Sequence, residues 1–430
     1  MDSWIAINTA IAIKPTIAIN TAIAITKGSS SMKNSIDDNN THPGSTLKRP
    51  THLDPIRLLE DLVRINSVNS FYPNGPGEEE LAKYIEAYWG RLGIKCERQN
   101  VLPGRDNIIA YLPGRDSSKR LLLEAHMDTV STDGMSIAPW EPTQRDGKLY
   151  GRGSCDTKAG LACMMAAIAQ LHSTGTSPAV DLIMAAVVDE EHSCTGVNKL
   201  CEDLKADAAV VAEPTEMKTV IASKGVLRWQ IHAIGRSAHS SKVHLGINAI
   251  EHMAKLILIL RSFHNNISTH HHPLLGAATA NIGLISGGVQ VNFVPDRCSI
   301  QIDRRVLPGE RVADVLGQYQ ALLGEAMGRI QNSQFIMDPP LLVDPSFETP
   351  SESRIAQASA QTLKRLGYCD TMHGVPFGSD ASKIRLLGID TIIFGPGSID
   401  QAHSAVEYVD IEQVRHACEY YQLLMKEFLP

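Results

Sequence analysis

The stretch LLLEAHMD at Leu121–Asp128 decides the fold, because it is an almost unbroken apolar run that ends on an imidazole and a carboxylate. Three more short apolar runs end in the same way: 182–188 before Asp189-Glu190-Glu191, 208–212 before Glu213, and 391–394 before the Gly-Pro-Gly loop that leads to His403. Such runs are typical of parallel strands buried on both faces. Open α/β sheets bind ligands beyond the carboxyl ends of their strands. We therefore expect the polar residues that follow these runs to share one site.

The loop GRGSCD at 151–156 adds another carboxylate, Asp156, just before an apolar segment that predicts a helix over Lys158–Leu171. The candidate ligands are then two imidazoles and three carboxylates: His126, Asp156, Glu191, Glu213 and His403. These donors suit zinc and also accept cobalt or manganese. Two divalent cations would keep some positive charge against three carboxylates, which favours a polarised carbonyl and a lowered pKa of bound water. The set predicts metal-assisted hydrolysis at two divalent metal ions, with zinc as the expected metal.

The acidic pair Glu190-Glu191 predicts a division of roles. Neighbouring residues project in different directions, so Glu191 can bind metal while Glu190 faces the substrate as general base. Taken alone, His126-Met127-Asp128 would more often be a surface or capping feature, and the acidic pair a solvated strand exit. Because all these groups follow strands, the metal site is favoured over both alternatives.

Five motifs, in this order and spacing, resemble the M20 family of metallopeptidases and deacylases, which includes acetylornithine deacetylase, succinyl-diaminopimelate desuccinylase, aminoacylase-1 and glutamate carboxypeptidases. The motifs are HMDTV at 126–130, GRG through DTKAG at 151–160, DEE at 189–191, AEP at 212–214 and GRSAHS at 235–240. The resemblance runs from about Pro55 to the C-terminus. It implies an α/β, zinc-peptidase-like catalytic domain with a mostly parallel central sheet flanked by helices, plus an inserted, smaller α+β (ferredoxin-like) lid and dimerisation domain.

The resemblance also implies metal ligands. Asp156 would bridge the two metals, His126 and Glu213 would complete one site, and Glu191 with His403 would complete the other. A glutamate at position 213 is typical of the deacylase and carboxypeptidase branches, whereas aminopeptidases and dipeptidases tend to have aspartate.

Two catalytic roles follow from the same resemblance. Glu190 would be the general base, and Asp128 would hold the imidazole of His126 in its ligating tautomer, as metal-bound histidines generally require. His239 would reach the active site of the partner subunit and stabilise the developing oxyanion. We therefore expect a homodimer formed through the lid domain.

Substrate-binding residues are implied at Asn292 and Arg305, which match positions that bind a substrate carboxylate; a guanidinium can donate two parallel hydrogen bonds to it. Arg304 competes for this role, and only one of the two should point inward because strand residues alternate faces. The loop around Ser379 resembles one beside the family's active site, where backbone amides could receive the substrate carboxylate. An N-cap for a helix over 382–387 explains Ser379 equally well.

The domain organisation follows from a change of pattern near Gly225. Segments 226–234, 277–285 and 298–302 predict strands, and 247–260 and 312–327 predict helices, which together suggest helices on one face of an antiparallel sheet. We predict a low-complexity, disordered segment over 1–50, a catalytic domain over 51–224 and 339–430, and the lid domain over 225–338.

Composition narrows the function. The 430 residues are 43% hydrophobic and 20% charged, enough for two domains with full cores, and the net charge of -7 argues against nucleic-acid binding. The eight cysteines include no Cys-x-x-Cys spacing and indicate reduced thiols in the cytoplasm.

The N-terminal segment contains a nonapeptide repeated at 5–13 and 17–25. Its pattern is not that of a secretory signal, and its apolar runs are too short to cross a membrane. Met32 is a candidate initiator.

We therefore predict a cytoplasmic enzyme of amino-acid metabolism that cleaves the amide bond of an N-acyl amino acid, a small carboxylate substrate. One alternative is a metallo-carboxypeptidase or dipeptidase that releases a C-terminal amino acid. Another is a catalytically inactive dimeric binding module, which the intact set of candidate ligands argues against.

Overall fold

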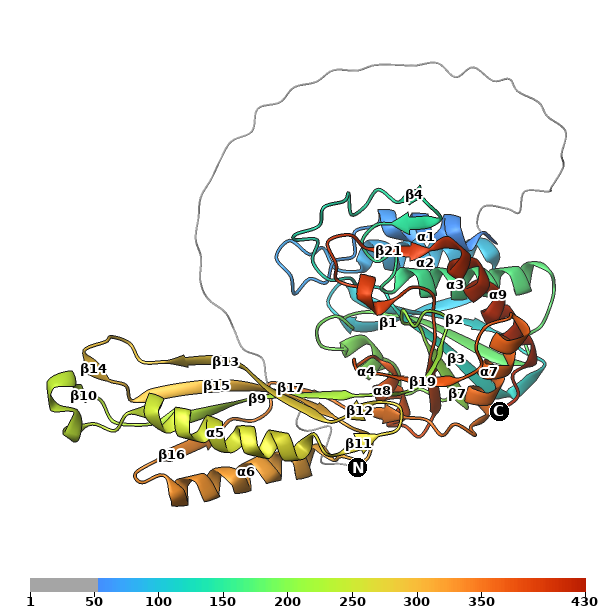
Figure 1. Ribbon diagram of the computed structural model, residues 1–430. Coiled ribbons are helices and arrows are strands. Elements are labelled where there is room, and N and C mark those ends of the chain that lie inside the picture. The colour runs from blue at the N-terminus through green and yellow to red at the C-terminus, as the bar shows by residue number, and fades with distance from the viewer. Residues whose placement is uncertain (1–52) are drawn as a thin grey trace, which may run out of the picture. The chain divides into compact units, whose positions relative to one another are not determined.

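The computed structural model describes residues 53–430 (Figure 1). The segment over 1–50 that is predicted to be disordered, with its repeat and Met32, lies outside the described residues. Among the described residues, no helix is both long and apolar enough to cross a membrane.

The larger sheet has nine strands in the order β1-β2-β6-β3-β7-β20-β8-β18, and β19 pairs with β8. Its strands are β1 (Lys95–Leu102), β2 (Arg105–Leu112), β3 (Asp116–His126), β6 (Val180–Val187), β7 (Ala208–Val211), β8 (Thr219–Ser223), β18 (Phe347–Glu348), β19 (Met372–Val375) and β20 (Asp390–Ile393). The four apolar runs form the central strands β6, β3, β7 and β20, which are parallel to one another. The prediction of a mostly parallel α/β sheet is confirmed.

Both faces of this sheet are covered, which explains why its central strands are apolar throughout. Leu121 and Leu123 of β3 pack into one core with α1 (Pro55–Arg64), α2 (Glu79–Leu92), α3 (Lys158–Ser173), α7 (Arg354–Arg365) and α9 (Ile411–Glu427). Leu122 packs into a second core on the other face with α4 (Thr195–Cys201) and α8 (Ala381–Arg385). The predicted helix at 158–171 is confirmed, and all of these residues are buried. Its position between sheet and α9 fixes the loop that carries Asp156.

A second, antiparallel sheet has the order β13-β15-β9-β16, with β17 also paired to β9. Its strands are β9 (Gly225–Ile234), β13 (Thr279–Gly287), β15 (Arg297–Val306), β16 (Gln334–Met337) and β17 (Leu342–Asp344). Helices α5 (Ala249–Ile267) and α6 (Val312–Arg329) bury one face of it, on which Trp229 and Ile231 lie. The strand β17 still belongs to this sheet although it follows residue 338.

Short elements complete the described chain. They are β4 (Thr143–Arg145), β5 (Lys148–Tyr150) and β21 (Tyr408–Asp410) in a three-stranded sheet, the pair β10 (Ala238–His239) and β14 (Phe293–Val294), the pair β11 (His271–His272) and β12 (Gly276–Ala277), and the 3-10 helices η2 (Ser240–Leu245) and η3 (Ile399–Gln401). The pairing of β21 with β5 brings the segment after His403 to the loop before Asp156.

Candidate active site

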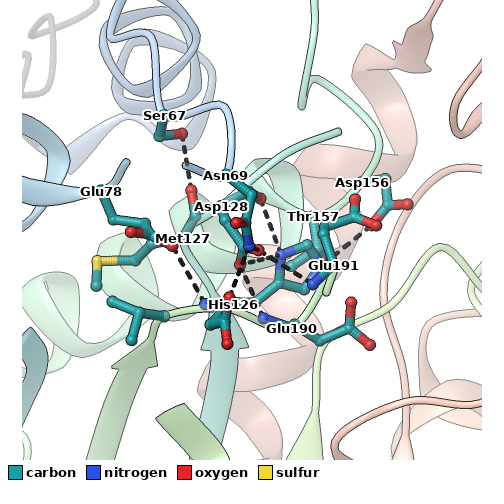
Figure 2. Close-up of polar contacts among 12 residues, drawn as sticks. Ser67, Asn69, Glu78, His126, Met127, Asp128, Asp156, Thr157, Glu190 and Glu191 are labelled. Atoms are coloured by element: carbon teal, nitrogen blue, oxygen red, sulfur yellow. Dashed lines mark hydrogen bonds and ion pairs between the residues drawn. The ribbon is translucent and has the colours of Figure 1, made fainter. Parts of the chain in front are cut away.

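Three of the predicted ligands, His126, Glu191 and His403, lie around a fourth, Asp156. One carboxylate oxygen of Asp156, Oδ1, lies 3.1 Å from His126 Nε2, and the other, Oδ2, lies 3.3 Å from His403 Nε2. The Nε2 atom of His403 also lies 3.1 Å from Glu191 Oε2. His126 ends β3, Glu191 follows β6, and Figure 2 shows both pointing toward the same space as Asp156. One ligand atom each of His126, Asp156 and Glu191 lies within 4.8 Å of the other two.

Glu213, the fifth predicted ligand, follows β7 and is buried, with 5% of its surface exposed. It is not a member of the compact group formed by His126, Asp156 and Glu191. Burial raises the pKa of Glu213 well above its usual range, and the negative charges of Asp156 and Glu190 add to this effect. The proximity of three carboxylates creates a demand for positive charge at this point of the structure.

The two histidines are placed to share a proton or a cation with these carboxylates. The Nδ1 atom of His126 donates to the backbone carbonyl of Asp128 at 3.0 Å, so a neutral imidazole directs the Nε2 lone pair at the carboxylate of Asp156. Two such acceptors need a proton or a metal ion between them. Burial alone would lower the pKa of His126, but hydrogen bonds to Asp128 and Asp156 raise it well above its usual range. Hydrogen bonds to Asp156 and Glu191 likewise raise the pKa of His403 to about 10. These residues therefore suit divalent cations, which would replace the protons.

The Asp128 carboxylate has several partners besides His126. It accepts the backbone amides of Glu190 and Glu191, at 3.1 and 3.0 Å, whereas its Oδ1 atom is 3.5 Å from His126 Nδ1. The closer partner of His126 is the backbone carbonyl of Asp128. Burial would raise the pKa of Asp128, but the hydrogen bonds of His126, Asn69 and the Glu191 amide lower it. Asp128 thus stays ionised and fixes the acidic pair that follows β6.

A buried polar network behind Asp128 has no counterpart in the sequence prediction. The side-chain amide of Asn69 donates to Asp128 Oδ2 at 2.7 Å and to Asp189 Oδ1 at 2.9 Å. Arg105 also reaches Asp189 Oδ1, at 3.0 Å, and Glu78 accepts the Asp189 amide at 3.2 Å. Asp189 has a positive φ of 69°, which turns the chain sharply at the end of β6. The residues of this network come from three segments that are far apart in the sequence, so no local sequence pattern predicts it.

Glu407 is a second residue that sequence reasoning missed. Its fully buried carboxylate accepts backbone amides of Gly153, Cys155 and Asp156, at 3.1, 2.9 and 3.1 Å, and pairs with Arg152 at 2.6 Å. Glu407 therefore holds the loop that carries Asp156 in position. The only sequence feature that pointed to Glu407 was its position four residues after the candidate ligand His403, with serine, alanine and valine between them.

Replacing Glu407 with Gln is expected to destabilise the protein and weaken metal binding. The substitution leaves the guanidinium of Arg152 buried without its carboxylate, and breaking such a pair costs about 3 kcal/mol. The loop that presents Asp156 also loses charge-assisted hydrogen bonds, so metal affinity should fall about 10- to 100-fold, as for other residues that orient ligands. Denaturant unfolding and metal titration measure the two effects.

The matched control is Glu325→Gln, which removes a carboxylate from an exposed pair with Arg329, where the N to O distance is 3.3 Å. Its effect on unfolding should stay within about 0.5 kcal/mol. Unchanged stability and metal affinity in Glu407→Gln would show that Glu407 does not hold the Asp156 loop.

The predicted substrate residues of the second sheet make their side-chain contacts locally. His239 is exposed on β10, and its Nδ1 accepts the backbone amide of Ser241 at 3.2 Å, so a neutral ring carries its proton on Nε2. Arg305 pairs with Asp303 at 2.9 Å. Asn292 is exposed, in the loop before β14. Between described residues, no hydrogen bond or ion pair of a single chain joins these three side chains to the five ligand candidates.

Arg304, the alternative to Arg305 as a substrate-binding residue, and Ser379 are both buried. Arg304 lies on the helix-covered face, 1% exposed, where it pairs with Glu310 at 2.6 Å. This position supports Arg305 as the residue available to a substrate. The Ser379 side chain is 1% exposed and its hydroxyl has no hydrogen-bond partner, while its backbone carbonyl accepts from Ser382 and Lys383 at the start of α8. The hydroxyl of Ser379 is thus enclosed in the structure.

Comparison with known proteins places this site in a family. The profile of peptidase family M20/M25/M40 matches residues 122–427. Acetylornithine deacetylase of Pectobacterium carotovorum is 31% identical over 369 residues, which cover 81% of this chain and 90% of that protein. A tripeptidase structure from Staphylococcus aureus aligns with a TM-score of 0.73 at 21% identity, over 87% of this chain and 98% of that one. A dinuclear metal-binding M20 peptidase from Bacillus subtilis aligns with a TM-score of 0.66 at 18% identity, over 88% and 99%.

The structural neighbours have the same fold, and the profile covers the segments that supply all five candidate ligands. The protein is a metal-dependent hydrolase of amide bonds, and the chain belongs to peptidase family M20/M25/M40.

Proposed function

We propose that the protein removes the acyl group from an N-acyl amino acid at a site that holds two divalent cations. The observation that carries this proposal is the position of Asp156, whose two carboxylate oxygens each face a different imidazole, at 3.1 and 3.3 Å. A carboxylate in this position suits a bridge between two cations. His126 and Glu213 would complete one metal site, and Glu191 and His403 the other.

The donor set defines the chemistry. Nitrogen and oxygen ligands favour zinc among the available divalent metals but accept cobalt and manganese. When bound, the cations would supply Lewis acidity that polarises the amide carbonyl and lowers the pKa of the attacking water. All five residues would bind the cations through side-chain atoms, which are imidazole nitrogens and carboxylate oxygens.

Glu190 is proposed as the general base. The Asp128 carboxylate holds the backbone amides of both Glu190 and Glu191, so the two side chains leave a fixed segment in different directions. Glu191 reaches His403, which leaves Glu190 to take a proton from the attacking water. Glu190 then returns the proton to the leaving nitrogen, because an amine must be protonated to depart.

The second sheet is proposed as a lid and dimerisation domain over residues 225–338. Its edge strand β13 exposes Leu284 and Ile285, at 62% and 60%, and the loop beyond it exposes Val291 fully. An apolar, unpaired strand edge suits a second copy of the chain. In the homodimer, Nε2–H of His239 would donate to the developing oxyanion of the partner's substrate.

The substrate proposal rests on groups that recognise a free carboxylate. Arg305 lies half-exposed on the face of the second sheet that α5 and α6 leave open, with 32% of its side chain accessible. Asn292 and the backbone amides near Ser379 would contribute further hydrogen bonds. The similarity to acetylornithine deacetylases supports a small N-acyl amino acid as the substrate.

The cellular location is proposed from the cysteines. Eight free cysteines support the cytoplasm as the location.

A substrate panel after metal removal tests the proposal. The chelated protein should lose at least about 99% of its activity, because the attacking water then loses its activation. Added Zn²⁺, Co²⁺ or Mn²⁺ should restore it. The panel compares N-acetyl-ornithine, N-succinyl-diaminopimelate, other N-acyl amino acids and small peptides, and kcat/KM should be highest for an N-acyl amino acid.

Mock-treated protein carried through the same buffer exchange is the control. A preference for peptides with a free C-terminus would replace the proposal with a carboxypeptidase or dipeptidase. Absence of hydrolysis of every substrate by metal-loaded protein would instead support the inactive binding module.

A further inference from the structure

A second cluster of metal-type side chains lies beside the proposed general base. One ligand atom each of Glu190, Cys194 and Asp380 lies within 4.8 Å of the other two. Glu190 and Cys194 lie in the loop between β6 and α4, and Asp380 precedes α8, so two separate parts of the chain deliver them. None of the three is among the five ligands proposed for the catalytic cations.

An independent observation concerns the hydrogen bonds of Asp380. Asp380 is 1% exposed, and no residue of the described part of the chain donates a hydrogen bond to either of its carboxylate oxygens. Buried carboxylate oxygens without donors are costly, so the cluster requires a proton or a cation.

The charges of the cluster balance with one divalent cation. Glu190, Asp380 and a Cys194 thiolate carry three negative charges. The ammonium group of Lys383, which contacts Asp344 at 2.7 Å and the Ser379 carbonyl at 3.1 Å, acts electrostatically on both Cys194 and Asp380. A divalent ion offsets two of the three negative charges, and Lys383, which it shares with Asp344, offsets part of the third. The sulfur ligand favours zinc over magnesium or calcium.

We propose that Glu190, Cys194 and Asp380 form a third, inhibitory site for a thiophilic divalent cation such as Zn²⁺. Occupation of this site ties the Glu190 carboxylate to the ion, so Glu190 no longer accepts a proton from water. Excess zinc then inhibits the enzyme without displacing the two catalytic cations. The inhibition rests on the proposed role of Glu190, whereas the binding of the ion does not.

Cobalt gives a signal that is independent of turnover. The five ligands proposed for the catalytic site contain no sulfur, so a thiolate-to-Co²⁺ charge-transfer band in the near ultraviolet reports the third site alone. Protein loaded with two equivalents of Co²⁺ is titrated with more Co²⁺ in a buffer without thiols. The band should appear only beyond two equivalents and grow to saturation with one further equivalent, and hydrolysis of the best panel substrate should fall in parallel.

Cys194→Ser should abolish the band and shift the inhibitory concentration of Zn²⁺ upward by at least about tenfold, while activity with two equivalents of metal stays unchanged. Asp380→Asn is a second variant that should weaken the band without removing the thiol. The matched control is Cys201→Ser, which removes a partly buried thiol from the same α4 segment and should keep both the band and the inhibition.

A band that survives Cys194→Ser, or that is lost in Cys201→Ser, would overturn the assignment of ligands. No band at millimolar Co²⁺ in the unmodified protein would mean that the cluster holds only a proton, and would overturn the site. If the band behaves as expected but no substrate is hydrolysed, the third site stands and the proposed hydrolytic function fails.

Discussion

Glu190→Gln is expected to lower kcat by about 10²- to 10⁴-fold while the protein keeps both catalytic cations. Glutamine preserves the size of the side chain but accepts no proton from water at neutral pH. The ligand Glu191 keeps its position because the Asp128 carboxylate still holds the backbone amides of residues 190 and 191. Turnover of the best panel substrate and elemental analysis of the purified variant measure the two quantities.

Glu412→Gln, which changes an exposed carboxylate in the first turn of α9, serves as the control and should keep both activity and metal. Full activity in Glu190→Gln would remove Glu190 from its role as base. Loss of a metal equivalent together with activity would instead place Glu190 among the ligands of the catalytic cations.

Asp156→Asn is expected to abolish high-affinity metal binding and, with it, activity. The substitution removes the one negative charge that faces both imidazoles, and it replaces one of the two oxygens with an amide nitrogen that cannot bind a cation. Affinity for at least one cation should fall more than about 100-fold, beyond the range typical of residues that only orient ligands. Metal titration followed by elemental analysis after desalting measures the loss.

The control is Asp146→Asn, in which the replaced side chain is 82% exposed in a turn with positive φ that asparagine tolerates. It should bind two equivalents of metal with unchanged affinity. Retention of two tightly bound equivalents by Asp156→Asn would mean that the carboxylate of Asp156 is not shared between the cations.

The parallel core of the fold was predictable because each central strand is buried on both faces. Leu122 packs against one layer and Leu121 against the other, and this requires an unbroken apolar run that is visible in the sequence. Convergence of the ligands followed from the same feature, since parallel strands end at one edge of the sheet. The antiparallel strands β1 and β2 were not predicted. No residue of β1 is buried, and β2, although mostly buried, begins with three polar residues that shorten its apolar run.

The residues that hold the ligands in place were beyond the reach of local patterns. Asn69 and Glu407 act through contacts across 59 and 251 positions of the chain, with Asp128 and with the Asp156 amide, so no spacing rule connects them. The Nδ1 atom of His126 lies 3.0 Å from the backbone carbonyl of Asp128 and 3.5 Å from its carboxylate, and a backbone carbonyl is present whatever the side chain. Side-chain identity therefore indicates candidate ligands more readily than the groups that position them.

The most direct test of the account is the location of the metals in crystals of the zinc-loaded protein, by anomalous diffraction at the zinc absorption edge. At stoichiometric zinc, two strong peaks per chain are expected, both in contact with Asp156. One should lie beside His126 and Glu213, and the other beside Glu191 and His403. Peaks that lie elsewhere, or a fully active protein with no peak at Asp156, would contradict it.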